Sequence, residues 1–239
     1  MLSNDEKIKG RIFASELDGS LIGKKVSIAG WVEDVRPLGS LIFLTVRDVS
    51  DIVQVVFIKG NTPEDIFSTA KLVARQSAVL IHGTVKESKA KDAKVEIQAD
   101  DMQVISKAYH PLPIDPTGRV GSSLDLRLDA RALDLRNPSS LAIFKIRHAT
   151  LQSIRKNLID KKFIEVSTPK IIGQAAEGGA TLFSLDYFGK KAFLAQSPQL
   201  YKEQLTLSLD RVFEISTYFR AETSHTRGHV IEFVTVVIE

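Results

Sequence analysis

Apolar and polar positions alternate with a period of two along much of the first hundred residues, which predicts β-strands. The pattern is interrupted at residues 63–74, where Pro63 is followed by Glu64 and Asp65. A proline at the first helical position and acidic residues in the first turn favour a short helix there. The expected strands cover residues 25–32, 41–47, 52–58, 77–85 and 94–99.

The order of these elements predicts a fold. Five short strands with a helix between the third and the fourth is the order of an OB-fold barrel. A five-stranded sandwich or another small barrel fits the same pattern. We therefore predict an all-β OB-fold barrel with one short helix, over residues 1–106.

The pattern changes after residue 106. Three prolines and two glycines between positions 111 and 121 predict a hinge or linker, over residues 107–138. Apolar residues then recur at helical spacing from Ser139 to Lys162, which predicts a long amphipathic helix capped by Ser139 or Ser140. The strand-like runs that follow predict an α+β domain with an antiparallel sheet, over residues 139–239. Because the last run reaches Glu239 without a cap or turn, we expect this domain to be incomplete.

Composition excludes several classes of protein. Hydrophobic residues make up 44% and charged residues 26% of the chain, as in ordinary soluble proteins. There is no cysteine, which excludes disulfides, thiolate metal sites and cysteine nucleophiles. The polar N-terminus has no secretory signal and no run is long enough to cross a membrane, so we expect a cytoplasmic protein. The net charge of +3 fits either an anionic partner or a mixed solvated surface.

Two strings in the second half carry candidate chemistry. Glu177 precedes two glycines, a pattern that suits a loop closing over a small ligand, although a plain turn explains it as well. Gln199 and Lys202 are spaced i, i+3 on a predicted helix and could together hold a small carboxylate. A capped helix with a solvated lysine is the alternative for this second string.

The strongest candidate lies between residues 219 and 233. Arg220 and Glu222 are two residues apart, so on a strand their side chains share one face. An arginine and a carboxylate are unfavourable in a core and make sense as a clamp for phosphate or carboxylate in a cleft. Phe233 lies beyond the intervening loop and could stack on a base. A surface hairpin is the alternative.

Together with Leu112-Pro-Ile-Asp-Pro-Thr-Gly118 and the segment 128–136, these strings resemble the aspartyl-tRNA synthetases of the archaeal and eukaryotic type, which are class IIb enzymes. The resemblance runs from about Arg11 to Glu239. It implies that the first domain binds the anticodon of tRNA(Asp), with Phe43 stacking on a base and Gln54 as a polar reader. The alternative for Phe43 is a core phenylalanine.

The resemblance also assigns the second domain. It implies a homodimer with Pro169 of motif 1 at the interface, and a motif 2 over residues 219–239. It further implies aspartate and ATP as substrates and Mg²⁺ as cofactor. The implied roles are catalysis by Arg220 and Glu222, ATP binding by Arg220, Glu222, His229 and Phe233, and aspartate binding by Glu177, Gln199 and Lys202.

Lys202 separates the related subfamilies. Asparaginyl enzymes usually have an apolar residue at this position, so the lysine favours an anionic substrate side chain. A lysine in the pocket would also repel the cationic substrate of the lysyl enzymes.

The chain departs from the family pattern in four places. Ala176 replaces a serine, Gly228 an arginine and Val237 an aspartate that binds the substrate ammonium; motif 3 and the Mg²⁺-binding carboxylates upstream of it are absent. We expect an aspartate–tRNA ligase present as an incomplete chain. The alternatives are a non-catalytic OB-fold paralogue or fragment that binds tRNA, and an enzyme that uses asparagine or charges both tRNA(Asp) and tRNA(Asn).

Overall fold

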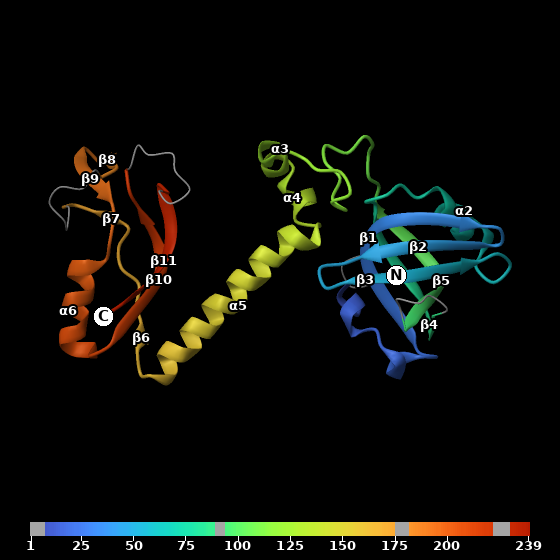
Figure 1. The fold of residues 1–239 in the computed structure, drawn as a ribbon, viewed down its shortest axis with the longest axis horizontal. Helices are drawn as coiled ribbons and strands as arrows, with labels where there is room; N and C mark the ends of the chain where they lie inside the picture. The colour runs from blue at the N-terminus through green and yellow to red at the C-terminus, as the bar shows by residue number, and fades with distance from the viewer. Residues whose placement is uncertain (1–7, 89–93, 175–181, 222–229) are drawn as a thin grey trace. The chain divides into compact units, whose positions relative to one another are not determined.

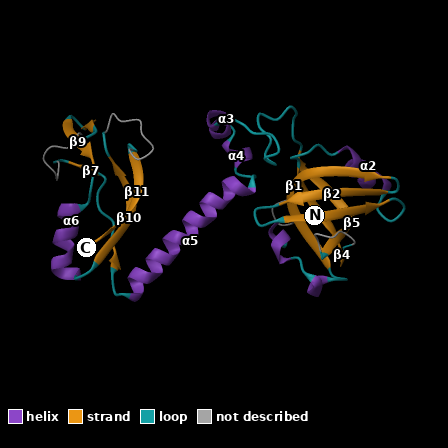
Figure 2. Cartoon of the chain, viewed as in Figure 1, coloured by secondary structure: helices purple, strands orange, loops and turns teal. Residues whose placement is uncertain are grey.

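The computed structural model describes residues 8–88, 94–174, 182–221 and 230–239 (Figure 1). Residue contacts divide the chain into two compact units, Met1–Leu141 and Ala142–Glu239. Strands form most of the regular secondary structure of the first unit, and helices and strands are mixed in the second (Figure 2). Within the described ranges, no helix is long and apolar enough to span a lipid bilayer.

The first unit contains a closed barrel with the strand order β1-β2-β3-β5-β4. Neighbouring strands are antiparallel except β3 and β5, which run parallel. The helix α2 (Glu64–Leu72) lies between β3 and β4 in the chain. This arrangement confirms the predicted OB-fold and excludes a sandwich. The strands are β1 (Lys25–Leu38), β2 (Leu41–Arg47), β3 (Ile52–Ile58), β4 (Ala78–Glu87) and β5 (Val95–Ser106).

Strand β1 is longer than predicted, because it continues to Leu38 instead of ending at Val32. Its pairing with β2 shifts register between Val32 and Asp34. Such an irregularity adds a residue to one strand and breaks the period-two alternation without ending the strand. The polar pair Glu33-Asp34 therefore resembled a strand end in the sequence.

The alternation along β2 separates an inner from an outer face. Ile42, Leu44 and Val46 are buried in the barrel core, whereas Phe43 and Thr45 are only partly buried. Successive side chains of a strand point to opposite faces, so Phe43 lies on the outside of the barrel. The alternative of a core phenylalanine at this position is wrong.

Two glycines allow the barrel strands to approach closely. A Cβ atom on Gly30 would collide with the carbonyl oxygen of Arg47, and one on Gly83 would collide with that of Gln98. Both contacts involve backbone atoms, which cannot move aside as the end of a flexible side chain would. A larger residue at either position would disrupt the pairing that closes the barrel.

Residues 107–138 contain two short helices, α3 (Leu124–Asp129) and α4 (Arg131–Asp134). The buried carboxylate of Asp134 accepts a hydrogen bond from Arg127 Nε at 2.7 Å and also pairs with Arg131. The hydrogen bond from Arg127 is the main reason that the pKa of Asp134 lies below its usual value. This ion pair ties the two helices together.

The same segment also contacts the barrel. The guanidinium carbon of Arg136 lies 4.5 Å from the centre of the Trp31 ring, in a cation–π arrangement. Arg136 Nη1 donates to the carbonyl oxygen and the Oε1 of Gln76, at 3.3 and 3.1 Å. The Ala108 N–H donates to Ser77 Oγ at 3.0 Å. Residues 107–138 accordingly belong to the first compact unit.

The long helix α5 (Pro138–Asp160) confirms the predicted amphipathic helix, but its cap differs from the prediction. The Ser139 N–H donates to Asn137 Oδ1 at 2.9 Å, so Asn137 is the capping residue. Ser140 Oγ instead donates to Asp134 Oδ1 at 3.0 Å. The prediction of Ser139 or Ser140 as cap is therefore wrong; Pro138 suits the first helical position and leaves the preceding Asn137 to cap.

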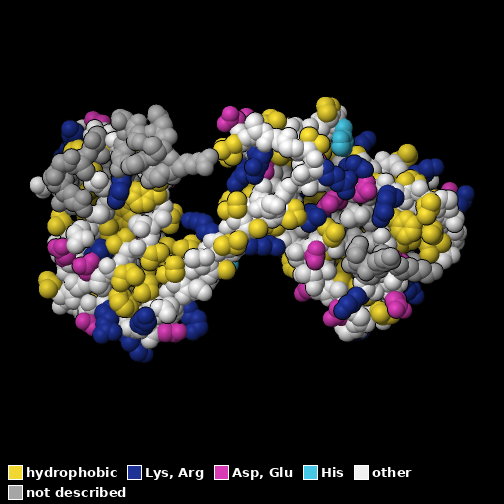
Figure 3. All heavy atoms as spheres, viewed as in Figure 1, with side chains coloured by type: hydrophobic (Ala, Val, Ile, Leu, Met, Phe, Trp, Pro, Cys, Tyr) yellow, Lys and Arg dark blue, Asp and Glu magenta, His cyan; other side chains and the backbone are white. Residues whose placement is uncertain are grey.

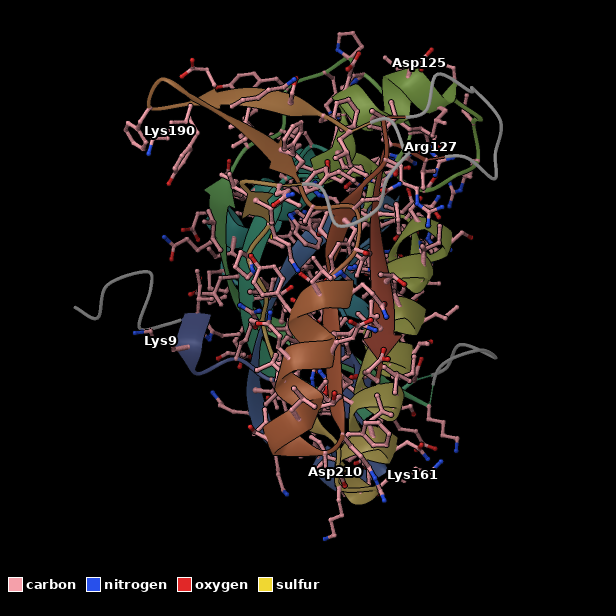
Figure 4. All side chains as sticks on the ribbon, turned by 90° about the vertical axis from the view of Figure 1, so that its left-hand side faces the viewer. Lys9, Asp125, Arg127, Lys161, Lys190 and Asp210 are labelled. Carbon is pink, nitrogen blue, oxygen red and sulfur yellow. The ribbon has the colours of Figure 1, made fainter. Side chains whose placement is uncertain are left out.

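The second unit contains two small sheets, with the orders β11-β10-β6 and β7-β9-β8. The β10–β11 pair is antiparallel, as are both pairs of the second sheet, whereas β6 runs parallel to β10. Helix α6 (Gln199–Leu209) packs against β10 (Figure 4). The predicted α+β domain with an antiparallel sheet is confirmed, with one parallel pair added. The strands are β6 (Ile164–Glu165), β7 (Ile171–Ile172), β8 (Ser184–Tyr187), β9 (Lys190–Leu194), β10 (Val212–Phe219) and β11 (Glu232–Ile238).

Candidate functional site

The outer surface of the barrel has an open groove of about 820 Å³. Phe43 on β2 and Gln54 on β3 both line it, so the structure brings together the two residues predicted to contact the anticodon. In the β2–β3 ladder, Phe43 pairs with Val56, and Thr45 pairs with Gln54 two positions further along. The two pairs therefore lie on the same face of the sheet. Apolar residues of β1 and β3 complete the wall around Phe43, among them Pro37, Leu38, Val56 and Ile58.

Polar and charged groups lie beside the aromatic ring. Gln54 Nε2 donates to Glu96 Oε2 at 2.8 Å, and Ser88 Oγ donates to the same oxygen at 3.3 Å. Arg36 and Lys86 supply positive charge to the groove lining. Single-stranded nucleic acids bind such surfaces by stacking bases on aromatic rings while cations contact the phosphates. The sequence alone did not identify Glu96 as a groove residue. Its contact with Gln54 joins β3 and β5, which are far apart in the chain.

The second candidate site is one face of the β10–β11 pair. Strand pairing sets Glu214 opposite Val237 and Tyr218 opposite Phe233. Tyr218, Phe233 and Val237 pack into one apolar cluster, which places them on the same face of the sheet. Glu239 continues this face, because it lies two residues beyond Val237. We call this surface the inner face.

Arg220 lies at one end of the inner face, directly after β10. Its N–H donates to the carbonyl oxygen of Ile231 at 2.9 Å, which fixes its backbone to the start of β11. Its guanidinium carbon lies 5.2 Å from the centre of the Phe233 ring. The structure thus brings together the residues predicted to hold the α-phosphate and to stack on adenine.

Lys202 lies at the other end, on the first turn of α6. Its side chain is only 3% exposed, so the alternative of a solvated helix lysine is wrong. The ammonium lies 2.6 Å from Glu239 Oε2 and 3.5 Å from the carbonyl oxygen of Ile238. Gln199 does not share these contacts, because its Nε2 donates to Glu203 Oε1 at 2.9 Å. Phe233 and Glu239 are six residues apart, about 20 Å along a strand, so this face suits an elongated ligand.

A buried carboxylate that the sequence did not reveal lies on the same face. Glu214 is 2% exposed. It accepts hydrogen bonds from the Thr168 N–H at 2.9 Å, Thr168 Oγ1 at 2.8 Å and Lys170 Nζ at 2.8 Å, and from the Tyr218 hydroxyl. A glutamate inside the apolar run Val212-Phe213-Glu214-Ile215 was the available signal, because charged residues are rarely buried without partners.

These contacts shift two pKa values. Burial alone would raise the pKa of Glu214, but the hydrogen bonds from Lys170, Tyr218 and Thr168 outweigh it and lower that pKa below its usual value. Burial, together with the hydrogen bond to Glu214, raises the pKa of Tyr218. Glu214 is therefore ionised and Tyr218 neutral at physiological pH.

The remaining predicted residues have different outcomes. Pro169 is exposed on the segment between β6 and β7, between the two residues that contact Glu214. Val237 is half-buried in the apolar cluster of the inner face. Glu177, Glu222 and His229 lie outside the described residues, as do Ala176 and Gly228.

Metal-ligating side chains do not cluster among the described residues. No group of three or more His, Cys, Asp or Glu side chains among them could hold a metal ion.

Comparison with known families identifies both units. Residues 26–105 match the family described as OB-fold nucleic acid binding domain, and residues 123–239 match tRNA synthetases class II (D, K and N). The chain belongs to the class II tRNA synthetases. The letters D, K and N in the family description stand for the aspartyl, lysyl and asparaginyl enzymes, and residues 123–239 match this group.

The chain is similar to archaeal aspartate–tRNA ligases. It is 45% identical to Aspartate–tRNA(Asp) ligase of Pyrococcus abyssi, a match that covers 92% of this chain and 50% of the relative. It is 46% identical to Aspartate–tRNA(Asp/Asn) ligase of Saccharolobus solfataricus, over 94% of this chain and 52% of the relative. The synthetase chain therefore spans about half the length of the curated relatives it matches.

Solved structures include both amino-acid specificities. The asparaginyl-tRNA synthetase of Pyrococcus horikoshii complexed with asparaginyl-adenylate is 36% identical with a TM-score of 0.88, over 95% of this chain and 52% of that one. The aspartyl-tRNA synthetase of Entamoeba histolytica is 30% identical with a TM-score of 0.78, over 95% of this chain and 49% of that one. Similarity of fold alone does not distinguish aspartate from asparagine.

Proposed function

We propose that this chain is part of an aspartate–tRNA ligase that activates aspartate with ATP and transfers it to tRNA(Asp). The observation that carries the proposal is the inner face, where a buried ammonium at one end faces the same surface as an arginine and an aromatic ring at the other. Lys202 would bind the substrate carboxylate, Arg220 the α-phosphate and Phe233 the adenine. One relative is named for tRNA(Asp) and another for tRNA(Asp/Asn), so tRNA(Asn) is a second candidate acceptor of the aspartyl group.

In the first step, an α-carboxylate oxygen of aspartate attacks the α-phosphorus of ATP. The new P–O bond gives aspartyl-adenylate, and pyrophosphate leaves with the electrons of the broken bond. Positioning and neutralisation of negative charge supply most of the catalysis in such phosphoryl chemistry. Arg220 at the end of β10 would provide the positive charge, and Glu222 would support it.

In the second step, a terminal ribose hydroxyl of the tRNA attacks the aspartyl carbonyl carbon, and AMP leaves. We assign Glu177 to a loop that closes over the amino acid, with Gln199 on the adjacent helix end. His229 is assigned to ATP binding. These assignments follow from the family resemblance and place all of the chemistry in the second unit.

The groove of the first unit would bind the anticodon loop. Phe43 presents a partly exposed ring for a base, and the amide of Gln54 offers hydrogen-bonding groups to a base edge. The neighbouring cations would contact the phosphates.

We further propose that the protein acts as a homodimer through Pro169 and α5. Pro169 is exposed, and Ile143, Phe144 and Ile146 of α5 are exposed hydrophobic residues. Hydrophobic side chains are visible along the surface of α5 (Figure 3). Apolar surface of this kind is typical of subunit interfaces.

A second candidate is an asparagine–tRNA ligase. The ion pair between Lys202 and Glu239 favours it, because a lysine whose charge is already balanced selects less strongly for an anionic substrate. A third candidate is a non-catalytic RNA-binding protein, which would use the groove and not the inner face.

The anticodon assignment is tested with Phe43→Ala. We expect the variant to bind an RNA hairpin carrying the tRNA(Asp) anticodon loop more weakly by about 1–3 kcal/mol, because a base loses its stacking platform. Fluorescence anisotropy at one fixed salt concentration measures the affinity, since phosphate contacts make it salt-dependent.

The matched control is Phe188→Ala, which removes an exposed phenylalanine from the turn between β8 and β9, outside the groove. Its affinity for the hairpin should equal that of the unmodified chain. A folded Phe43→Ala variant with unchanged affinity would show that the groove does not bind the anticodon.

A further inference from the structure

The ammonium of Lys202 already has a carboxylate partner within this chain. Glu239 Oε2 lies 2.6 Å from Lys202 Nζ. The backbone of Glu239 is fixed in turn, because its N–H donates to the Val212 carbonyl at 3.0 Å and its carbonyl accepts from the Val212 N–H at 3.1 Å. These two bonds extend the β10–β11 ladder by one pair, so the carboxylate is presented from a sheet.

The two partners differ in exposure. The Lys202 side chain is 3% exposed and the Glu239 side chain is 35% exposed. Lys202 is therefore enclosed by its surroundings, whereas the carboxylate of Glu239 is only partly enclosed. An ammonium has three N–H donors, and the described acceptors near it are Glu239 Oε2 and the distant carbonyl oxygen of Ile238. Lys202 can thus donate a further hydrogen bond to a ligand.

The other carboxylate described on the inner face cannot respond to a ligand in this way. Glu214 is buried and accepts hydrogen bonds from Thr168, Lys170 and Tyr218. Val237, which lies between Glu214 and Glu239 on this face, has no charge. Among the described residues of the inner face, Glu239 is therefore the carboxylate that balances the charge of Lys202.

We propose that Glu239 is a specificity-determining residue whose carboxylate occupies the place on Lys202 that an acidic substrate side chain requires. This inference rests on the proposed function, in which Lys202 binds the substrate side chain. A lone buried ammonium would strongly prefer a carboxylate over an amide. The resident carboxylate balances that charge and repels a second carboxylate, so it narrows the preference for aspartate over asparagine.

The test uses the 239-residue chain and two non-hydrolysable ligands, the aspartyl and the asparaginyl sulfamoyl analogues of the adenylate. Isothermal titration calorimetry gives a dissociation constant for each. We expect Glu239→Gln to shift the ratio of the two constants about tenfold toward the aspartyl analogue, because it removes the competing charge and keeps the shape. Glu64→Gln, an exposed glutamate on α2 with the same change of net charge, should leave the ratio unchanged.

A double-mutant cycle tests whether the effect acts through Lys202. In a Lys202→Leu background, Glu239→Gln should no longer shift the ratio. A ratio that stays constant in the single variant, moves toward the asparaginyl analogue, or shifts equally in the Lys202→Leu background would overturn the inference while leaving the proposed function intact. Failure of the unmodified chain to bind either analogue would contradict the proposed function and this inference together.

Discussion

Glu214 on the inner face and Lys202 at its end are both buried charged residues, and the sequence revealed only Lys202. Lys202 stood out because it occurs at helical spacing from Gln199 in a string that resembles a known pocket. Its partner Glu239 lies 37 residues away, and two of the partners of Glu214, Thr168 and Lys170, lie 46 and 44 residues away. Periodicity describes neighbours in sequence, so it could not predict which charges meet. Gln199 differs from its prediction for a local reason, since its amide donates to Glu203 one turn further along the same helix.

Glu214 should make the stability of the second unit depend on pH. Its pKa in the folded chain lies below the usual value, which is about 4.3 in an unfolded chain. The stabilisation is therefore complete above about pH 4.3 and is lost as the pH falls through the lower, folded-state pKa. We expect Glu214→Gln to destabilise the unit by about 3 kcal/mol or more at neutral pH, because Lys170 loses its buried partner. The variant should also lose less further stability in acid than the unmodified chain.

Urea-induced unfolding at about pH 7 and about pH 3.5, monitored by hydrogen exchange of the β10 amides, measures the loss of stability at neutral pH and the further loss in acid. Glu165→Gln is the control, because Glu165 forms a more exposed ion pair with Arg155. Such pairs contribute little, about 0–1 kcal/mol. Equal loss of stability in acid for Glu214→Gln and the unmodified chain would show that Glu214 is not the titrating group.

At the scale of elements, the sequence predicted the type of most helices and strands, but it missed the short elements α3, α4, β7 and β8 and misplaced several ends. The strand signal is strong because alternation persists over several residues, as along β2. Ends depend on single local events that alternation does not report. Because the register shifts after Val32, β1 continues through the polar pair Glu33-Asp34. Because Asn137 caps α5, the helix begins before the two serines that were predicted to cap it.

The cap of α5 can be tested locally. Asn137→Ala should destabilise the start of the helix by about 0.5–2 kcal/mol, because the Ser139 N–H loses the side-chain acceptor at 2.9 Å. Faster hydrogen exchange of the Ser139 amide reports the loss directly. Ser139→Ala tests the cap that the sequence had predicted, and it should leave exchange of the following amides unchanged. A larger effect from Ser139→Ala than from Asn137→Ala would contradict the structural assignment.

At the scale of the whole molecule, the sequence predicted a barrel followed by a synthetase-like domain, and placed a linker over residues 107–138. The structure assigns those residues to the first compact unit, which ends at Leu141. Prolines and glycines correctly predicted irregular backbone, but irregular backbone can still pack. The contacts of Arg136 with Trp31 and Gln76 are side-chain contacts between distant positions, so composition alone could not reveal them.

This packing predicts that residues 1–141 form a more stable unit than residues 1–106. The longer fragment keeps the cation–π contact on Trp31, worth about 0.5–2 kcal/mol, and the hydrogen bonds to Gln76 and Ser77. Trp31 is the chain's single tryptophan, so its fluorescence reports on this contact during urea unfolding. We expect the longer fragment to unfold at a higher urea concentration, and Arg136→Ala to remove much of the difference. Equal midpoints for the two fragments would mean that residues 107–138 act as a linker after all, and that the barrel gains nothing from the segment that follows it.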